Sequence, residues 1–362
     1  MNALTNYLNN GVESIVRQAL KSSFQNPLES AFIAKFILSQ NAAAKKRQQA
    51  EEAGQHIPPF LIASIASQCN LFCKGCYARA NHSCGQNAVQ EELPTKKWEQ
   101  IFRESSDLGI SFILLAGGEP LMRTDILQTA VLFPNIIFPV FTNGTLFDET
   151  ALQLFHHRRN LIPILSLEGD SVQTDARRGE GVSALLNHTI EQMQEKGIFY
   201  GASITVTTEN LQTITDDAFI AELQQKDCKV ILFVEYVPAQ KSAERLTLND
   251  SERETLAARQ EELKSKFPHI IFLSFPGDEK SVGGCLAAGR GFFHINAAGG
   301  AEPCPFSPFS DTSLKDHSLM EALQSPLFQK LQSENILQAK HEGGCTLFDQ
   351  QDTVKHIACQ LS

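Results

Sequence analysis

The stretch CNLFCKGCY, residues 69–77, places three cysteines within eight residues, and it directly follows the apolar run FLIASI at residues 60–65. Three residues separate Cys69 from Cys73, and two separate Cys73 from Cys76. Thiolates this close in sequence suit iron–sulfur clusters, whereas a structural zinc site usually takes four ligands from two separate halves. The alternatives are a zinc knuckle or three buried free thiols. The spacing favours a four-iron cluster with three protein ligands, which leaves one iron open.

Composition limits the classes of protein to consider. The 362 residues are 42% hydrophobic and 20% charged, as in a soluble globular protein with one large domain and a smaller one. The sequence has 31 basic and 41 acidic residues, and the formal net charge of −10 argues against nucleic-acid binding. No run is long enough to span a membrane, and the first residues lack the pattern of a signal peptide. We therefore expect a cytoplasmic protein that does not act at a membrane, in which cysteines serve metal or thiol chemistry.

Short apolar runs alternate with amphipathic segments from residue 59 onward. Such runs are typical of parallel strands buried on both faces, and they are expected at residues 60–66, 112–116, 136–141, 161–165, 202–207 and 230–234. Helices are expected around Trp98–Leu108 and Leu186–Met193, each ending near a glycine. Residues 1–56 are predicted to be helical. Six βα repeats imply an α/β fold with a parallel sheet, in which chemistry belongs on the loops after the carboxyl ends of the strands.

The cysteine run, the aromatic Tyr77 after it, and Gly117-Gly118-Glu119-Pro120 downstream together resemble the radical S-adenosylmethionine (SAM) enzymes. The resemblance implies a partial (β/α)6 barrel like an incomplete TIM barrel. It also implies that Cys69, Cys73 and Cys76 hold a 4Fe-4S cluster whose open iron chelates SAM. One-electron reduction would cleave SAM to methionine and a 5′-deoxyadenosyl radical, which abstracts a hydrogen atom from the substrate. A flavodoxin- or ferredoxin-type protein would donate the electron.

The resemblance assigns SAM contacts to loops after several strands. The segment Ser166-Leu167-Glu168-Gly169 resembles the family's Ser-Leu-Asp-Gly, with a longer carboxylate in the aspartate position. The SAM-binding residues expected on these grounds are Tyr77, Gly117, Gly118, Glu119, Pro120, Asn143, Ser166, Glu168 and Arg178. By itself, Asn143 could belong to an ordinary turn, and Arg178 could be a surface charge.

Glu235 is an ionisable residue at the carboxyl end of the sixth expected strand. It is therefore a candidate catalytic residue for substrate binding or proton transfer. A salt-bridged or solvated glutamate is the alternative.

The region after residue 284 resembles the auxiliary-cluster domain called SPASM, or twitch in its short form, which opens with a cysteine and a hairpin. Cys285, Cys304 and Cys345 are the expected ligands of a second 4Fe-4S cluster. The fourth ligand would be Cys359, a substrate atom or nothing. Cys359 could instead be a buried apolar cysteine on a closing helix with Val354 and Ile357.

These observations divide the chain into four parts: a helical extension (1–56), the partial barrel (57–240), a helical connection (241–284) and a hairpin-plus-helix cluster domain (285–362). Within catalysis, the two open functions are maturation of a peptide or protein and synthesis of a small molecule or cofactor. An iron–sulfur electron carrier without SAM chemistry is the alternative from another class.

Overall fold

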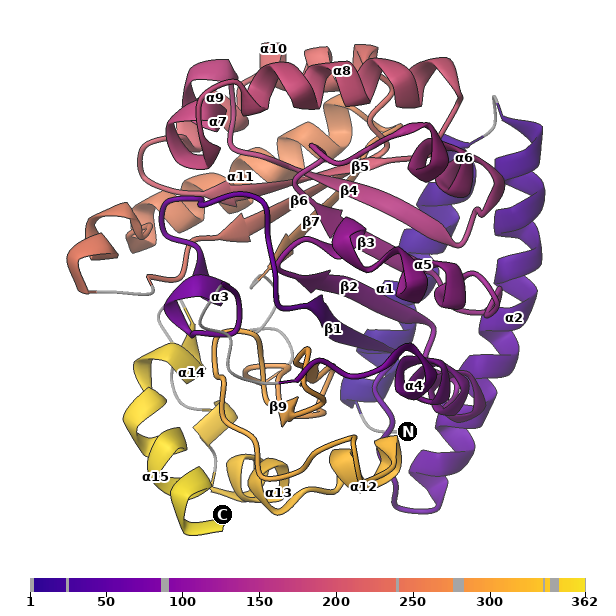
Figure 1. Ribbon diagram of the computed structural model, residues 1–362, viewed down its shortest axis with the longest axis vertical. Helices are drawn as coiled ribbons and strands as arrows, with labels where there is room; N and C mark the ends of the chain where they lie inside the picture. Colours follow the sequence, from indigo (N-terminus) through magenta and orange to yellow (C-terminus); the bar gives the residue numbers. More distant parts are fainter. Residues whose placement is uncertain are drawn as a thin grey trace.

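A curved β-sheet forms the centre of the molecule (Figure 1). The computed structural model describes residues 3–23, 26–85, 91–238, 241–275, 283–334, 336–338 and 345–361. The sheet has nine strands in the order β7-β6-β5-β4-β3-β2-β1-β8-β9. Neighbouring strands from β7 to β8 are parallel, which confirms the α/β fold expected from the sequence.

All six expected strands are present, with ends shifted by a few residues. They are β1 (Phe60–Ala66), β2 (Phe112–Gly117), β3 (Phe138–Thr142), β4 (Leu161–Leu167), β5 (Gly201–Val206) and β6 (Val230–Glu235). Their order in the sheet follows their order in the chain, so each βα unit adds the next strand on the same side. The carboxyl ends of these strands consequently lie along one edge, where the motif-bearing loops meet.

Three further strands extend this sheet. Strand β7 (Ile271–Phe275) pairs with β6 and lies in the stretch predicted to be a helical connection, because an apolar run follows the charged helix there. At the other edge β8 (His294–Ile295) pairs in parallel with β1 and antiparallel with β9 (Ala301–Glu302). The C-terminal hairpin therefore continues the barrel sheet. The division of the chain into four domains stays a prediction.

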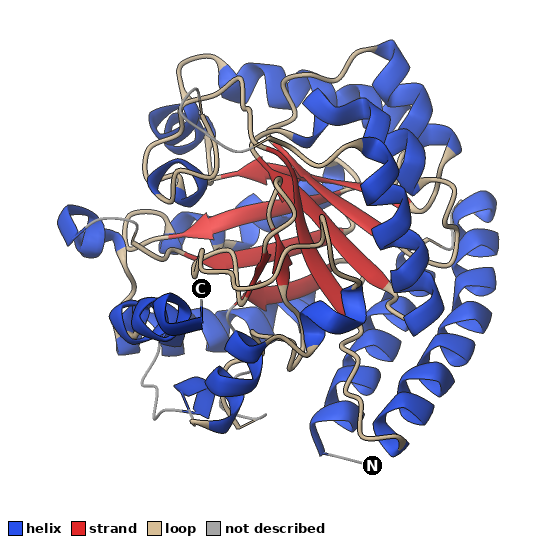
Figure 2. Cartoon of the chain, turned by 60° about the horizontal axis from the view of Figure 1, so that its bottom comes forward, coloured by secondary structure: helices blue, strands red, loops and turns tan. Residues whose placement is uncertain are grey.

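Helices surround the sheet (Figure 2). Those that follow the strands are α3 (Tyr77–Ala80), α4 (Thr95–Leu108), η1 (Pro120–Arg123), α5 (Thr124–Ala130), α6 (Glu149–His157), α7 (Ser171–Arg178), α8 (Val182–Glu195), α9 (Leu211–Ile214), α10 (Asp217–Gln225), η2 (Lys241–Leu246) and α11 (Asp250–Lys266). The C-terminal ones are α12 (Leu319–Leu323), α13 (Pro326–Ser333), η4 (Ile336–Gln338), α14 (Thr346–Asp349) and α15 (Gln351–Leu361). Among the described residues, no helix combines the length and apolar character that crossing a membrane requires.

The expected N-terminal helices are α1 (Ala3–Ser22) and α2 (Pro27–Glu52). They lie side by side along one flank of the molecule (Figure 1). Their apolar side chains, including Phe36, pack on Phe112, Ile137 and Ile162, which lie at or just before the starts of β2, β3 and β4. The pair thus covers the amino-terminal ends of these strands and leaves the opposite edge to the functional loops.

Candidate active site

The cysteine loop runs from the end of β1 to the start of α3. Cys69, Cys73 and Cys76 are unpaired, half-buried thiols. Burial raises the pKa of the Cys69 and Cys73 thiols, so the protein alone does little to create thiolates. Arg79 closes the loop, because its Nη2 donates to the Leu71 carbonyl at 2.5 Å.

The loop after β2 lies directly against the cysteine loop. The amide of Gly118 donates to the carbonyl of Ala66 at 2.7 Å, and that of Glu119 donates to the carbonyl of Gln68 at 2.8 Å. A Cβ at Gly118 would stand 2.0 Å from the Gln68 carbonyl oxygen, so only glycine permits this approach. Gly117 and Gly118 remain half-exposed, which leaves their backbone open to a ligand.

The Glu119 carboxylate turns inward. It is 1% exposed, and it accepts hydrogen bonds from Thr142 Oγ1 at 2.6 Å, the Asn143 amide at 2.8 Å and the Leu121 amide at 3.0 Å. Burial raises the pKa of Glu119, and these donors oppose that effect. The carboxylate therefore joins the loops after β2 and β3, and the adjacent Pro120 begins η1.

Asn143 brings the loop after β3 to the thiols. Its Nδ2 donates to Asn70 Oδ1 at 2.8 Å and lies 3.9 Å from Cys69 Sγ, while its Oδ1 accepts from Thr145. Three predicted elements, the cysteines, the Gly-Gly-Glu-Pro segment and Asn143, thus meet at one place.

Glu168 and Arg178 form the opposite wall. Glu168 Oε1 accepts from Arg177 Nη1 at 2.7 Å and from Arg178 Nη2 at 2.5 Å. Glu168 Oε2 and Arg178 Nε are buried, and neither has a hydrogen-bond partner among the described residues. Ser166 is half-buried in β4 beside Ser203 of β5. An unpartnered buried polar atom costs about 1–3 kcal/mol, so a polar ligand that hydrogen-bonds these two atoms would be stabilised here.

A cavity of about 670 Å³ opens between Glu168 with Arg177 and the second half of the cysteine loop. Its lining includes Cys73, Cys76, Glu168, Arg177 and Tyr236. This volume is within the usual range for a small-molecule site. The structure therefore provides a chamber that reaches two of the three clustered thiols.

Sequence reasoning missed Tyr236, which follows β6. Tyr236 is 4% exposed, and its hydroxyl has no hydrogen-bond partner in the described part of the chain. A Cβ on Gly75 would stand 2.7 Å from that hydroxyl, so the phenol lies against the cysteine loop. Glu235 is not brought to the cavity, because its Oε1 accepts from Arg253 Nε of α11 at 2.5 Å. Side chains alternate between the two faces of a strand, and this alternation is the sequence pattern that could have identified Tyr236. The charge of Glu235 instead drew attention to the neighbouring residue.

The four C-terminal cysteines differ in burial. Cys285 and Cys304 are buried in the main core, and Cys345, half-buried at the start of α14, packs against that core. Cys359 is exposed on α15, while Val354 and Ile357 are buried. The hypothesis of a buried apolar Cys359 is therefore wrong, because this position faces away from the helix's buried side.

Tyr77 lies between the two groups of cysteines. Burial raises the pKa of its hydroxyl, and nearby Cys76 and Cys304 add to this effect. Its ring contacts Phe306 edge-on, with 5.2 Å between centroids. Tyr77 thus connects the cysteine loop with the C-terminal region.

Residues 64–221 match the family model of the Radical SAM superfamily. These residues form a radical SAM domain. The chain is 30% identical over 160 residues to Fe-coproporphyrin III synthase of Methanosarcina barkeri, covering 43% of this chain and 39% of that protein. It is 26% identical over 167 residues to the sporulation killing factor maturation protein SkfB of Bacillus subtilis, covering 44% of this chain and 39% of that protein. The chain therefore spans about two fifths of the length of these curated relatives.

A solved structure has the same fold over most of the chain. Streptococcus suis SuiB, bound to the precursor peptide SuiA, superposes with a TM-score of 0.64 at 17% sequence identity. The match covers 83% of this chain and 75% of SuiB. The structural match therefore extends beyond residues 64–221, which form the radical SAM domain of this chain.

The residues present fit the cluster and SAM that this domain type binds. Among the described residues, no three histidine, cysteine or acidic side chains converge as they would around a single metal ion. A four-iron cluster holds its cysteine sulfurs farther apart than a single metal ion does. The three thiols of the cysteine loop can each bind one iron of such a cluster, which leaves the fourth iron without a protein ligand. The unpartnered atoms of Glu168, Arg178 and Tyr236 are hydrogen-bonding groups that a bound nucleotide could satisfy.

Proposed function

We propose that this protein is a radical SAM enzyme that modifies a peptide or protein. The observation that carries the proposal is a cavity lined by two of the three clustered thiols, Cys73 and Cys76, and by the unpartnered polar groups of Glu168 and Tyr236. The Gly117–Gly118 backbone lies directly against the same cysteine loop. Cys69, Cys73 and Cys76 would hold the 4Fe-4S cluster, which would supply the one-electron reduction of SAM and with it radical chemistry on the substrate.

The chain's own residues orient the nucleotide and exclude water. Glu168 Oε2 can accept hydrogen bonds from ribose hydroxyls, and Arg178 Nε can donate to a carboxylate. Arg177 fixes this wall, because its carbonyl accepts from the Lys74 amide at 2.8 Å and its Nε donates to the Lys74 carbonyl at 3.2 Å. This wall would thereby hold a bound nucleotide in a fixed orientation beside the cysteine loop.

Cys285, Cys304 and Cys345 are proposed to hold an auxiliary 4Fe-4S cluster without Cys359, whose exposed position suits a free surface thiol. Such a cluster could anchor the substrate or remove an electron from it. The hairpin brings Cys304 close to Tyr77, and thus to the first cluster site.

A flavodoxin- or ferredoxin-type protein is the proposed electron donor. Phe72 is 74% exposed directly beside Cys73, and the guanidinium of Arg79 lies 4.0 Å from its ring centroid. An exposed aromatic residue with a cation suits a transient contact with an acidic carrier. The many cysteines fit a reducing compartment, the cytoplasm.

The peptide substrate is supported by the SkfB and SuiB similarities. A second candidate is a small molecule bearing carboxylates, supported by the similarity to Fe-coproporphyrin III synthase and by cationic Lys74, Arg79 and Arg245 around the cavity. These groups would pair with substrate carboxylates.

Anaerobic reconstitution with iron, sulfide, SAM and a reductant tests the proposal. We expect about eight irons per chain and formation of 5′-deoxyadenosine. Replacing all three loop cysteines with alanine should abolish SAM cleavage and leave about half of the iron. Intact clusters without SAM cleavage would instead favour an iron–sulfur electron carrier. Deuterium transfer into 5′-deoxyadenosine from a labelled peptide or from a labelled tetrapyrrole bearing carboxylates would distinguish the two substrate classes.

A further inference from the structure

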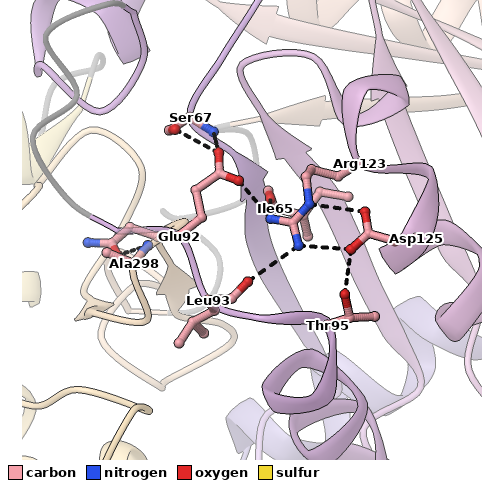
Figure 3. A network of polar contacts seen from close by, with 9 residues as sticks. Ile65, Ser67, Glu92, Leu93, Thr95, Arg123, Asp125 and Ala298 are labelled. Atoms are coloured by element: carbon pink, nitrogen blue, oxygen red, sulfur yellow. Dashed lines mark hydrogen bonds and ion pairs between the residues drawn. The ribbon is translucent and has the colours of Figure 1, made fainter.

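The start of the cysteine loop is held by Glu92, which lies just before α4. The amide and the Oγ of Ser67 both donate to Glu92 Oε1, at 2.7 and 2.6 Å (Figure 3). Ser67 follows the last residue of β1 and precedes Cys69 by two positions. One carboxylate oxygen therefore fixes the direction in which the chain leaves the strand toward its thiols.

The other oxygen of Glu92 connects this loop to the loop after β2. Glu92 Oε2 accepts from Arg123 Nη1 at 2.7 Å. Arg123 ends η1, three residues after the last residue of the Gly-Gly-Glu-Pro segment, and its Nε and Nη2 each donate to Asp125 at 3.0 Å (Figure 3). The side chains of Glu92 and Arg123 are 26% and 17% exposed, so the ion pair is partly shielded from water.

The segment 91–95 also reaches the C-terminal hairpin. The Leu93 amide donates to the Ala297 carbonyl at 2.7 Å, in the turn between β8 and β9. Leu93 is fully buried, and a Cβ at Gly299 of the same turn would stand 3.0 Å from Leu93 Cδ2. Figure 3 shows Ala298 on the hairpin side of this network and Arg123 on the barrel side. The segment thus lies between the cysteine loop and the hairpin that carries Cys304.

We propose that Glu92 is a positioning residue for the cluster that binds SAM. Through Ser67 and Arg123, it holds the cysteine loop in the conformation that binds the cluster. The 91–95 segment fixes the position of that loop relative to the β8–β9 hairpin. This inference rests on the proposed function. Groups that orient metal ligands from outside typically change metal affinity by roughly 10- to 100-fold when they are replaced. If the ion pair served folding alone, its loss would lower the melting temperature without changing the thiols or the cluster.

The test compares Glu92→Gln and Ser67→Ala with the wild type, using the full chain purified without oxygen. Glu92→Gln keeps the side-chain size but replaces the oxygen that faces Arg123 with an NH₂ donor. Ser67→Ala removes a single hydroxyl, and it tests the proposal even if Glu92→Gln folds poorly. Glu99→Gln is the control, because Glu99 forms an exposed ion pair with Arg103 on α4. Circular dichroism verifies that each variant is folded.

The first readout is the alkylation rate of Cys69, Cys73 and Cys76 in the cluster-free protein, followed by mass spectrometry. The second is iron retention by the reconstituted protein against a chelator, with the electron paramagnetic resonance signal recorded before and after SAM addition. We expect altered alkylation, roughly 10- to 100-fold weaker iron retention at the loop and a changed response to SAM in both variants, but not in Glu99→Gln. Folded variants that match the wild type in alkylation and iron retention would overturn the proposal.

The two readouts separate this inference from the proposed function. A wild-type protein that retains no iron at the three thiols contradicts the proposed function and this role together. A wild-type protein that retains iron and cleaves SAM, with variants that do the same equally well, contradicts only the role of Glu92.

Discussion

Glu235 and Tyr236 are consecutive residues at the carboxyl end of β6, and their side chains point to opposite sides of the sheet. The Glu235 carboxylate pairs with Arg253 of α11 at 2.5 Å, whereas the Tyr236 hydroxyl lies against Gly75 in the cysteine loop. Side chains alternate along a strand, so the residue that reaches the cavity is the one after the glutamate. The ionisable residue therefore pairs with the helix layer, and the phenol faces the cavity.

Replacing Tyr236 with phenylalanine should weaken SAM binding and stabilise the ligand-free protein. The hydroxyl is buried without a partner among the described residues, so its removal relieves a desolvation cost in the empty cavity. In the complex the lost hydrogen bond is worth about 0.5–1.5 kcal/mol, or roughly 2- to 12-fold in Kd. Calorimetric titration of the cluster-loaded protein with SAM and thermal melts of the ligand-free protein measure the two effects. Unchanged SAM affinity would contradict a ligand contact by Tyr236.

Replacing Glu235 with glutamine should lower the stability of the protein and leave SAM binding unchanged. Its carboxylate is almost fully buried against Arg253, so the variant should lose about 1–3 kcal/mol of unfolding free energy. SAM affinity and the rate of SAM cleavage by folded protein should stay at wild-type levels. Loss of cleavage at unchanged stability would restore Glu235 as a catalytic candidate.

Gly118→Ala should displace the cysteine loop. The new Cβ would stand 2.0 Å from the carbonyl oxygen of Gln68 and 2.4 Å from its carbon, and backbone cannot give way as a flexible side chain can. We expect a lower melting temperature together with loss of iron from the loop site.

Gly11→Ala is the matched control, because nothing lies within 4 Å of a Cβ there. That exchange within α1 should stabilise the protein by about 0.5–1 kcal/mol. Iron content equal to wild type in Gly118→Ala would contradict the close approach of the two loops.

The strands and the loop motifs could be predicted from the sequence because they depend on local patterns. Buried parallel strands show as apolar runs, and the three clustered cysteines are neighbours in the chain. Long-range pairing could not be predicted in this way. Glu92 meets Ser67 and Arg123 only after the fold brings three separate loops together. The carboxylate of Glu119 was expected to be available to SAM, but the fold supplies donors from Thr142 and Asn143 that occupy it.

Cys359 should behave as a surface thiol rather than a cluster ligand. It is exposed on α15, whereas Cys228 is buried, donates to the Val230 carbonyl at 3.2 Å, and has its pKa raised to about 12 by burial. In folded protein at pH 7.5, a maleimide should therefore label Cys359 quickly and Cys228 only after unfolding. Cys359→Ser should retain the wild-type iron content, measured after anaerobic reconstitution. Loss of about four irons from this variant would instead make Cys359 a ligand of the auxiliary cluster.

The Glu92–Arg123–Asp125 network should make stability depend on pH in the acid range. Hydrogen bonds from Arg123 hold the pKa of Asp125 below its ordinary 3.8. Burial alone would raise the pKa of Glu92 above its ordinary 4.5, but hydrogen bonds from Ser67 and the charge of Arg123 outweigh burial and lower it. Both carboxyls bind protons more weakly in the folded chain than in the unfolded chain. Their contribution is therefore fully present well above pH 4.5 and is lost as the pH falls through the lowered values.

Asp125→Asn tests this dependence in thermal melts between pH 7 and pH 3. The variant should melt below the wild type at pH 7, and the difference should shrink toward acid pH, because protonation removes the same charge from the wild type. Glu99→Gln, which breaks an exposed ion pair within α4, should change the unfolding free energy at pH 7 by only about 0.3–0.5 kcal/mol. A difference between Asp125→Asn and wild type that stays constant or grows toward pH 3 would show that Asp125 does not carry its charge against Arg123 in the folded protein.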